Sequence, residues 1–122
     1  MSFPSVPDSS KKTGADRREA VRRHLRSPAL VLLPGQPGRV GRTVDVSETG
    51  LCLMLPDGIA GGTECMVGFE LPDKAGARKR YQSRVRVVHS VLSTQGDGFK
   101  IGMQFMQLPD DTRRALEAFI RE

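Results

Sequence analysis

Short apolar or alternating runs, separated by clusters of Gly, Pro and Asp, dominate the chain after Pro28. Apolar side chains at every second position put one face of a strand in a core and the other in solvent. Six segments read as strands, at residues 29–33, 39–46, 51–55, 64–71, 80–91 and 99–105. The sequence therefore predicts a mainly all-β fold, a closed or nearly closed six-stranded antiparallel β-barrel, because closure removes exposed sheet edges.

Alternation also predicts which side chains face the core. In residues 39–46 and just beyond, one face is expected to carry Val44 and Val46, and the other Thr43, Asp45 and Ser47. In residues 80–91, an inward row that starts at Tyr81 is expected to end at His89. The imidazole of His89 is suited to stack on a base, but a structural histidine at a strand end is the favoured interpretation.

The two ends of the chain differ from this pattern. Residues 109–122 switch to a period near 3.6, which predicts a C-terminal α-helix packed through Leu116, Phe119 and Ile120 and capped by Asp110 or Asp111. Residues 1–16 mix Pro, Ser, Lys and Gly, as disordered tails do. Residues 17–28 are a flexible basic arm, compatible with two helical turns or a loop. We therefore expect one domain over residues 17–122, with its barrel at 29–107.

Positive charge is concentrated ahead of the first strand. The net charge is +5, and the stretch from Lys11 to Arg26 holds seven bases and two acids, while the rest of the chain is balanced. Arg18, Arg22 and Arg26 recur every fourth residue, and in a helix such like charges cost roughly 0.2–0.5 kcal/mol per pair. A guanidinium group binds phosphate oxygens or guanine, so this cluster of arginines fits an anionic partner. It also fits a basic arm that is merely solvated.

Several classes of function lack support in the sequence. There is no hydrolase, zinc-protease or P-loop motif, so we expect no catalytic residues and a role other than that of an enzyme. Cys52 and Cys65 lack CxxC spacing and read as buried thiols, with no metal or cofactor expected. No signal peptide and no run of about 18 apolar residues is seen, which favours a cytoplasmic protein without membrane insertion.

The polar run DVSETG, from Asp45 to Gly50, joins two of the expected strands. It fits a simple turn in which Ser47 or Thr49 bonds to local backbone and Gly50 adopts a positive φ. It also fits a binding site, because an ionised Asp accepts two hydrogen bonds, such as those offered by the N1-H and N2-H2 edge of guanine. A glycine turn beside it would let a flat ligand approach the backbone.

RRHLR (Arg22 to Arg26) followed by DVSETG resembles the RxxxR and [D/N]xSxxG signature of the PilZ domain family, which are receptors for the bacterial second messenger cyclic di-GMP. With GFKIGMQF and LEAFI downstream, the resemblance covers nearly all of the chain from Arg22 to Ile120. It implies a PilZ-type barrel whose mobile arm wraps the ligand.

The resemblance also implies the site. Arg22 and Arg26 match the two motif arginines, which contact guanine and phosphate, and Arg23 is a candidate auxiliary cation. A guanine and its neighbouring phosphate are received at the barrel surface by the second motif, here Asp45, Ser47 and Gly50.

We therefore expect a cyclic di-GMP receptor that changes conformation on binding and acts on a downstream partner protein. Two alternatives stay open. One is a PilZ-type adaptor that binds proteins without the ligand, and the other is a small nucleic-acid-binding barrel. The second is disfavoured and no DNA partner is expected, because aromatic residues make up 5% of the chain, too few for a base-stacking stripe.

Overall fold

The structure, a computed structural model, describes residues 21–95 and 97–122, so the expected tail and the first part of the arm, residues 17–20, lie outside the described residues. Within the described part, the elements follow in the order β2 (Arg23–His24), β3 (Pro28–Leu32), β4 (Arg39–Val46), β5 (Gly50–Leu55), β6 (Glu64–Pro72), β7 (Arg78–Leu92), β8 (Phe99–Gln107) and α2 (Asp110–Arg121).

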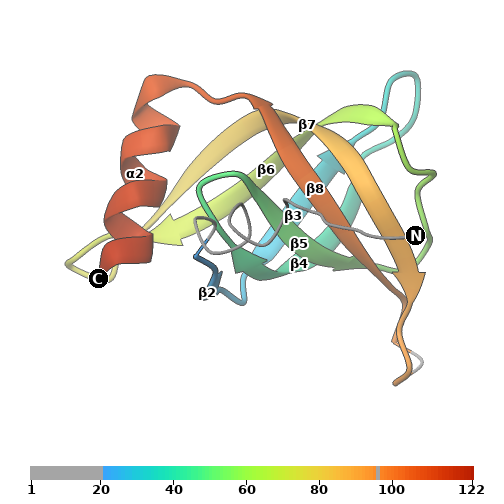
Figure 1. The fold of residues 1–122 in the computed structure, drawn as a ribbon, viewed down its shortest axis with the longest axis horizontal. Coiled ribbons are helices and arrows are strands. Elements are labelled where there is room, and N and C mark those ends of the chain that lie inside the picture. Colours follow the sequence, from blue (N-terminus) through green and yellow to red (C-terminus); the bar gives the residue numbers. More distant parts are fainter. Residues whose placement is uncertain (1–20, 96) are drawn as a thin grey trace, which may run out of the picture.

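Six strands close into an antiparallel barrel, with helix α2 at one end (Figure 1). The order around the barrel is β4-β3-β6-β7-β8-β5, and β5 pairs with β4 to complete the ring. The short strand β2 adds to β4 as a seventh strand. The expected fold class, a six-stranded barrel with a C-terminal helix, is confirmed.

The described part of the basic arm contains a two-residue strand and no helix, which corrects the helical alternative for these residues. Strand β2 pairs with β4, placing Arg23 opposite Val46 and His24 opposite Asp45. The next residue, Leu25, donates its backbone N–H to the Val44 carbonyl at 3.0 Å, and its side chain joins the core at 5% exposure. One apolar side chain and a backbone ladder therefore hold this basic segment against the barrel.

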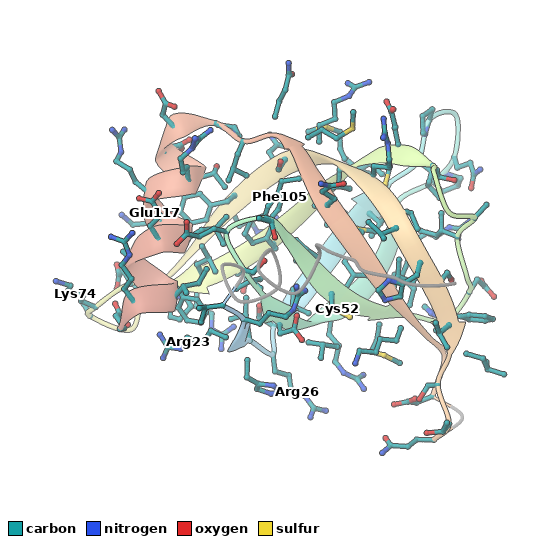
Figure 2. The ribbon with its side chains drawn as sticks, in the orientation of Figure 1. Arg23, Arg26, Cys52, Lys74, Phe105 and Glu117 are labelled. Atoms are coloured by element: carbon teal, nitrogen blue, oxygen red, sulfur yellow. The ribbon has the colours of Figure 1, made fainter. Side chains whose placement is uncertain are left out.

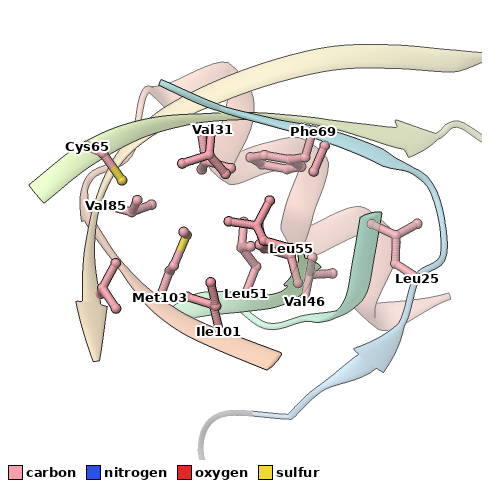
Figure 3. Close-up of a cluster of buried hydrophobic side chains, with 14 of the residues drawn as sticks. Leu25, Val31, Val46, Leu51, Leu55, Cys65, Phe69, Val85, Ile101 and Met103 are labelled. Atoms are coloured by element: carbon pink, nitrogen blue, oxygen red, sulfur yellow. The ribbon is translucent and has the colours of Figure 1, made fainter. Parts of the chain in front are cut away.

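The barrel interior is filled by aliphatic and sulfur-containing side chains with few aromatics (Figure 3). Phe69 is the largest fully buried side chain, and its ring lies 6.1 Å from that of Phe105 between centroids. Helix α2 closes one end with Leu116 and Phe119, both buried as expected. Leu116, completely removed from water, alone represents about 1.5–3 kcal/mol of burial free energy.

Two β-bulges change the alternation that the sequence predicts. In β4 the register with β5 shifts between Thr43 and Asp45, so Thr43 is buried while Val44 is only half-buried. In β7 the register with β8 shifts between Val87 and His89, so His89 is exposed. The expected inward positions of Val44 and His89 are therefore wrong, because each bulge adds one residue and turns the following side chains to the other face.

The N-cap residue of helix α2 is Pro109, which offers no capping side chain, so neither Asp110 nor Asp111 is the N-cap residue as expected. The Asp111 Oδ1 nevertheless accepts from the Thr112 N–H of the first turn at 2.8 Å. Asp110 and Asp111 still lie in the first turn and Arg121 in the last, where their charges suit the helix dipole. No helix among the described residues has both the length and the apolar character needed to cross a membrane.

Candidate functional site

The two motif segments meet at Arg22 and Asp45. The Arg22 Nε donates to the Asp45 Oδ1 at 2.7 Å, and the exposed fractions of the two side chains are 44% and 23%. The antiparallel pairing of β2 with β4 explains the contact, because it sets His24 opposite Asp45 and so brings the preceding arm residues alongside. A guanidinium group and a carboxylate are thus adjacent at the barrel surface.

Arg26 follows at the end of the arm, with its side chain exposed and projecting away from the barrel (Figure 2). Among the described residues it has no hydrogen bond or ion pair.

Arg23 points to a different place, the carboxyl end of helix α2 (Figure 2). Its NH1 donates to the Phe119 carbonyl, its guanidinium lies 4.2 Å from the centroid of the Phe119 ring, and NH1 is 3.6 Å from the Glu122 Oε1. The structure thus brings Arg22 to Asp45 but directs Arg23 to the helix, and the two neighbouring arginines link the arm to two separate elements.

Ser47 builds the turn that ends β4. Its hydroxyl accepts from the backbone N–H groups of Thr49 and Gly50, each at 3.2 Å, and its own N–H donates to the Gly50 carbonyl at 2.8 Å. The side chain is completely buried. The local hydrogen bonding expected of a simple turn is therefore present.

Gly50 is required for a reason that the sequence does not reveal. It is not among the described glycines with positive φ, so the expected left-handed conformation is wrong. A Cβ at this position would lie 2.1 Å from the Met103 carbonyl oxygen. Glycine at position 50 thus permits the close approach of β5 to β8, which fixes the turn beside Asp45.

Cys52 lies opposite Asp45 on β5 and is 4% exposed. Burial raises the pKa of its thiol, the Asp45 carboxylate raises it further, and the charges of Lys100 and Arg22 act in the opposite direction. The charges of Asp45, Arg22 and Lys100 therefore all act on the Cys52 thiol. The described residues contain no cluster of His, Cys, Asp and Glu that could hold a metal ion.

A cavity of about 690 Å³ lies elsewhere on the barrel, between β3, β6, β7 and the start of α2. Its lining includes Leu30, Leu32, Tyr81 and Arg80, and it contains no residue of either motif. This cavity is therefore separate from the surface at which the two motif segments meet.

The protein-family model that matches the chain is the PilZ domain, over residues 16–122. The chain belongs to the PilZ domain family. The family assignment that the two motifs suggested is thereby confirmed. No curated protein sequence matches the chain.

Solved structures with the PilZ barrel resemble the chain in fold, at low identity. The inhibitor of motility MotI/DgrA of Bacillus subtilis has a TM-score of 0.72 at 17% identity, and the alignment covers 86% of this chain and 50% of that one. The PilZ domain of YcgR from Escherichia coli, solved with c-di-GMP, has a TM-score of 0.64 at 13% identity, with 86% and 89% covered. A tetrameric PilZ domain protein from Xanthomonas campestris gives 0.61 at 15% identity, with 84% and 87% covered. The chain thus spans half the length of the MotI/DgrA chain.

Sequence reasoning overlooked two residues beside the motif of this PilZ domain, Lys100 and Gly102. Both lie on β8 next to β5, where Gly102 pairs with Cys52 and Lys100 with Met54. A signal was present, because Gly102 interrupts an outward row that also holds Lys100 and Gln104. A glycine at such a strand position indicates that another group approaches the backbone closely.

Proposed function

We propose that this protein is a cyclic di-GMP receptor that changes conformation on binding and acts on a partner protein. The observation that supports this most is the contact of Arg22 with Asp45, because it joins the two motif segments at one surface. Cyclic di-GMP carries two phosphates and two guanines, so its site needs cations and a carboxylate for a base edge. Both groups are available here, and neither requires a cofactor or catalytic chemistry.

Binding begins with an exchange of partners at Asp45. A guanine presents N1-H and N2-H2 to the carboxylate and replaces the Arg22 Nε–H as its donor. The released Arg22 and the exposed Arg26 then bind phosphate oxygens, where their planar forks donate two hydrogen bonds each. Ser47 and Gly50 belong to the proposed site through the turn that holds Asp45 and presents the neighbouring backbone to the ligand.

Arg23 carries the change to helix α2. Any rearrangement of the arm that follows the release of Arg22 acts on the next residue, which holds the carboxyl end of the helix through Phe119 and Glu122. We propose that the exposed surface of the helix end is what the partner protein reads. In this scheme Arg23 is an auxiliary cation of the arm only after it leaves the helix.

The remaining parts of the proposal follow from membership in the family. We propose one domain over residues 17–122, a cytoplasmic location and no enzymatic activity, because PilZ proteins act as effectors or adaptors. The solved PilZ domain of YcgR with c-di-GMP supports the choice of ligand. The name of MotI, an inhibitor of motility, supports an action on a partner.

Isothermal calorimetry tests the site assignment directly. We expect wild type to bind cyclic di-GMP with micromolar or tighter affinity, and Arg26→Ala and Asp45→Ala each to weaken it at least tenfold. Lys74→Ala, an exposed cation on the loop between β6 and β7, is the matched control and should bind as wild type does. Unchanged affinity in both motif variants would contradict the assignment.

One observation favours a second candidate, a PilZ-type adaptor that does not bind the ligand. Asp45 already has a donor in Arg22, and Ser47 is fully engaged within its own turn, so the motif residues satisfy each other without a nucleotide. Absence of any binding heat or amide shift with cyclic di-GMP in wild type would favour this alternative.

A further inference from the structure

A row of paired residues crosses the outer face of the barrel next to Asp45. In strand order, His24 of β2 pairs with Asp45, Asp45 with Cys52 of β5, Cys52 with Gly102 of β8, and Gly102 with His89 of β7. Residues in register on neighbouring strands share a face of the sheet. The row thus joins the carboxylate of the motif to a histidine that lies far along the chain.

The middle of this row faces outward. Leu51 and Leu53, which flank Cys52, belong to the core cluster, as do Ile101 and Met103, which flank Gly102. Alternation then places Cys52 and Gly102 on the opposite, outer side of the sheet. Cys52 is buried yet not part of the core cluster, which agrees with this placement.

The β7 bulge delivers His89 to the same face. The register shift after Val87 turns His89 out of the barrel, and its side chain is exposed. The imidazole lies over Gly102, since a Cβ built on that glycine would be 2.2 Å from the His89 Cε1 and 2.7 Å from its Nε2. Because Gly102 has no side chain, the His89 ring can lie across β8 toward Cys52.

We propose that His89 is a further ligand-binding residue, whose imidazole stacks on the guanine that Asp45 holds by its edge. This inference rests on the proposed cyclic di-GMP function. Asp45 and Gly102 are two strand spacings apart, roughly 10 Å, which a purine and its hydrogen bonds to Asp45 span over the small Cys52 side chain. The base is then held at one edge by the Asp45 carboxylate and stacked on the His89 imidazole.

The chemistry of the three positions suits a flat base. Cys52 and Gly102 are small, uncharged and buried, so neither places a bulky or charged group between Asp45 and His89. An imidazole is planar, and histidine is among the side chains on which unpaired bases stack in nucleic-acid complexes. The exposure of His89 shows that part of its side chain remains open to a ligand.

Titration calorimetry with cyclic di-GMP on the full chain tests the proposal. Base stacking on an aromatic side chain is strong enough that we expect His89→Ala to weaken binding about tenfold. His89→Phe, which keeps a planar ring, should remain within about threefold of wild type, whereas His89→Asn should resemble His89→Ala. Val91→Ala, an exposed position on the same strand, is the control that should bind as wild type.

A double-variant cycle separates stacking from a structural effect. Gly102→Ala places a Cβ where the imidazole lies, so it should also weaken binding, but it should add nothing in the His89→Ala background. The His89 ring protons of wild type should shift upfield on addition of the ligand. If wild type binds cyclic di-GMP and the His89→Ala variant binds it with the same affinity, the stacking is overturned and the proposed receptor function stays intact. Failure of wild type itself to bind would overturn both.

Discussion

Arg22 and Asp45, 23 residues apart in the chain, form a hydrogen-bonded ion pair of 2.7 Å on the outer surface of the barrel. The pair joins a basic segment ahead of the first barrel strand to the end of β4. Both partners are partly exposed, so solvent weakens their attraction. The contact therefore contributes little to the stability of the fold.

Removal of either partner should separate a role in ligand binding from a role in stability. Asp45→Ala or Arg22→Ala should change the free energy of unfolding by less than about 1 kcal/mol, as expected for an exposed ion pair. Each should lower the affinity for cyclic di-GMP at least tenfold. Urea denaturation measures the first quantity and calorimetry the second. A loss of stability of several kcal/mol in either variant would mean that the pair is structural.

Gly50→Ala should destabilise the barrel by at least about 2 kcal/mol, because its Cβ would meet the Met103 carbonyl oxygen, which belongs to rigid backbone. Gly61→Ala is the matched control. A Cβ at that position would lie 3.5 Å from the Val88 carbonyl oxygen, an ordinary contact, and the change should be within about 0.5 kcal/mol. Equal stability of the two variants in urea would refute the close approach of β5 to β8.

Arg23→Ala should loosen the end of helix α2. The variant loses the hydrogen bond to the Phe119 carbonyl and a cation–π contact, which for partly exposed groups is about 0.5–1 kcal/mol. Amide hydrogen exchange should become faster at residues 117–121 while the barrel strands keep their protection. Arg113→Ala, an exposed change near the start of the same helix, should not have this effect at its end. Unaltered exchange at residues 117–121 in Arg23→Ala would remove the link between arm and helix.

The two buried thiols predict a loss of stability in alkali. Burial raises the pKa of Cys52 and of Cys65 above the ordinary value of 9.0, so the unfolded chain releases these protons at lower pH than the folded chain. The thiol contribution to stability is complete below pH 9 and falls as the pH rises through and beyond that value. Urea denaturation from pH 7 to 10 should show a steeper decline for wild type than for the Cys52→Ala, Cys65→Ala double variant. Parallel curves would show that the thiols do not contribute.

Much of the fold follows from local patterns in the sequence. Alternation identified the six barrel strands, and the helical period located α2, because burial on one face constrains both. The bulges at Val44 and Val88 could not be predicted, since the register of a strand depends on its pairing partner and an inserted residue leaves no clear local mark in the sequence. The inward assignment of His89 failed for this reason alone.

The candidate site was predictable in its residue types and less so in its contacts. The two motifs predicted that the arginines and Asp45 form one site, but which arginine reaches the carboxylate depends on the pairing of β2 with β4. Arg23 was expected to aid the ligand, yet the Phe119 ring and carbonyl, 96 residues away, hold its side chain. Long-range contacts of this kind are set by tertiary packing and cannot be read from local spacing.

An amide-resolved titration with cyclic di-GMP, with GTP as the control, shows whether the arm and the β4 turn bind the same ligand. We predict that the shifts concentrate in residues 21–27 and 45–50 and saturate together, and that GTP at the same concentration leaves both segments unchanged. Saturating cyclic di-GMP that shifts only one of the two segments, or neither, would contradict the convergence of the arm and the β4 turn on one ligand.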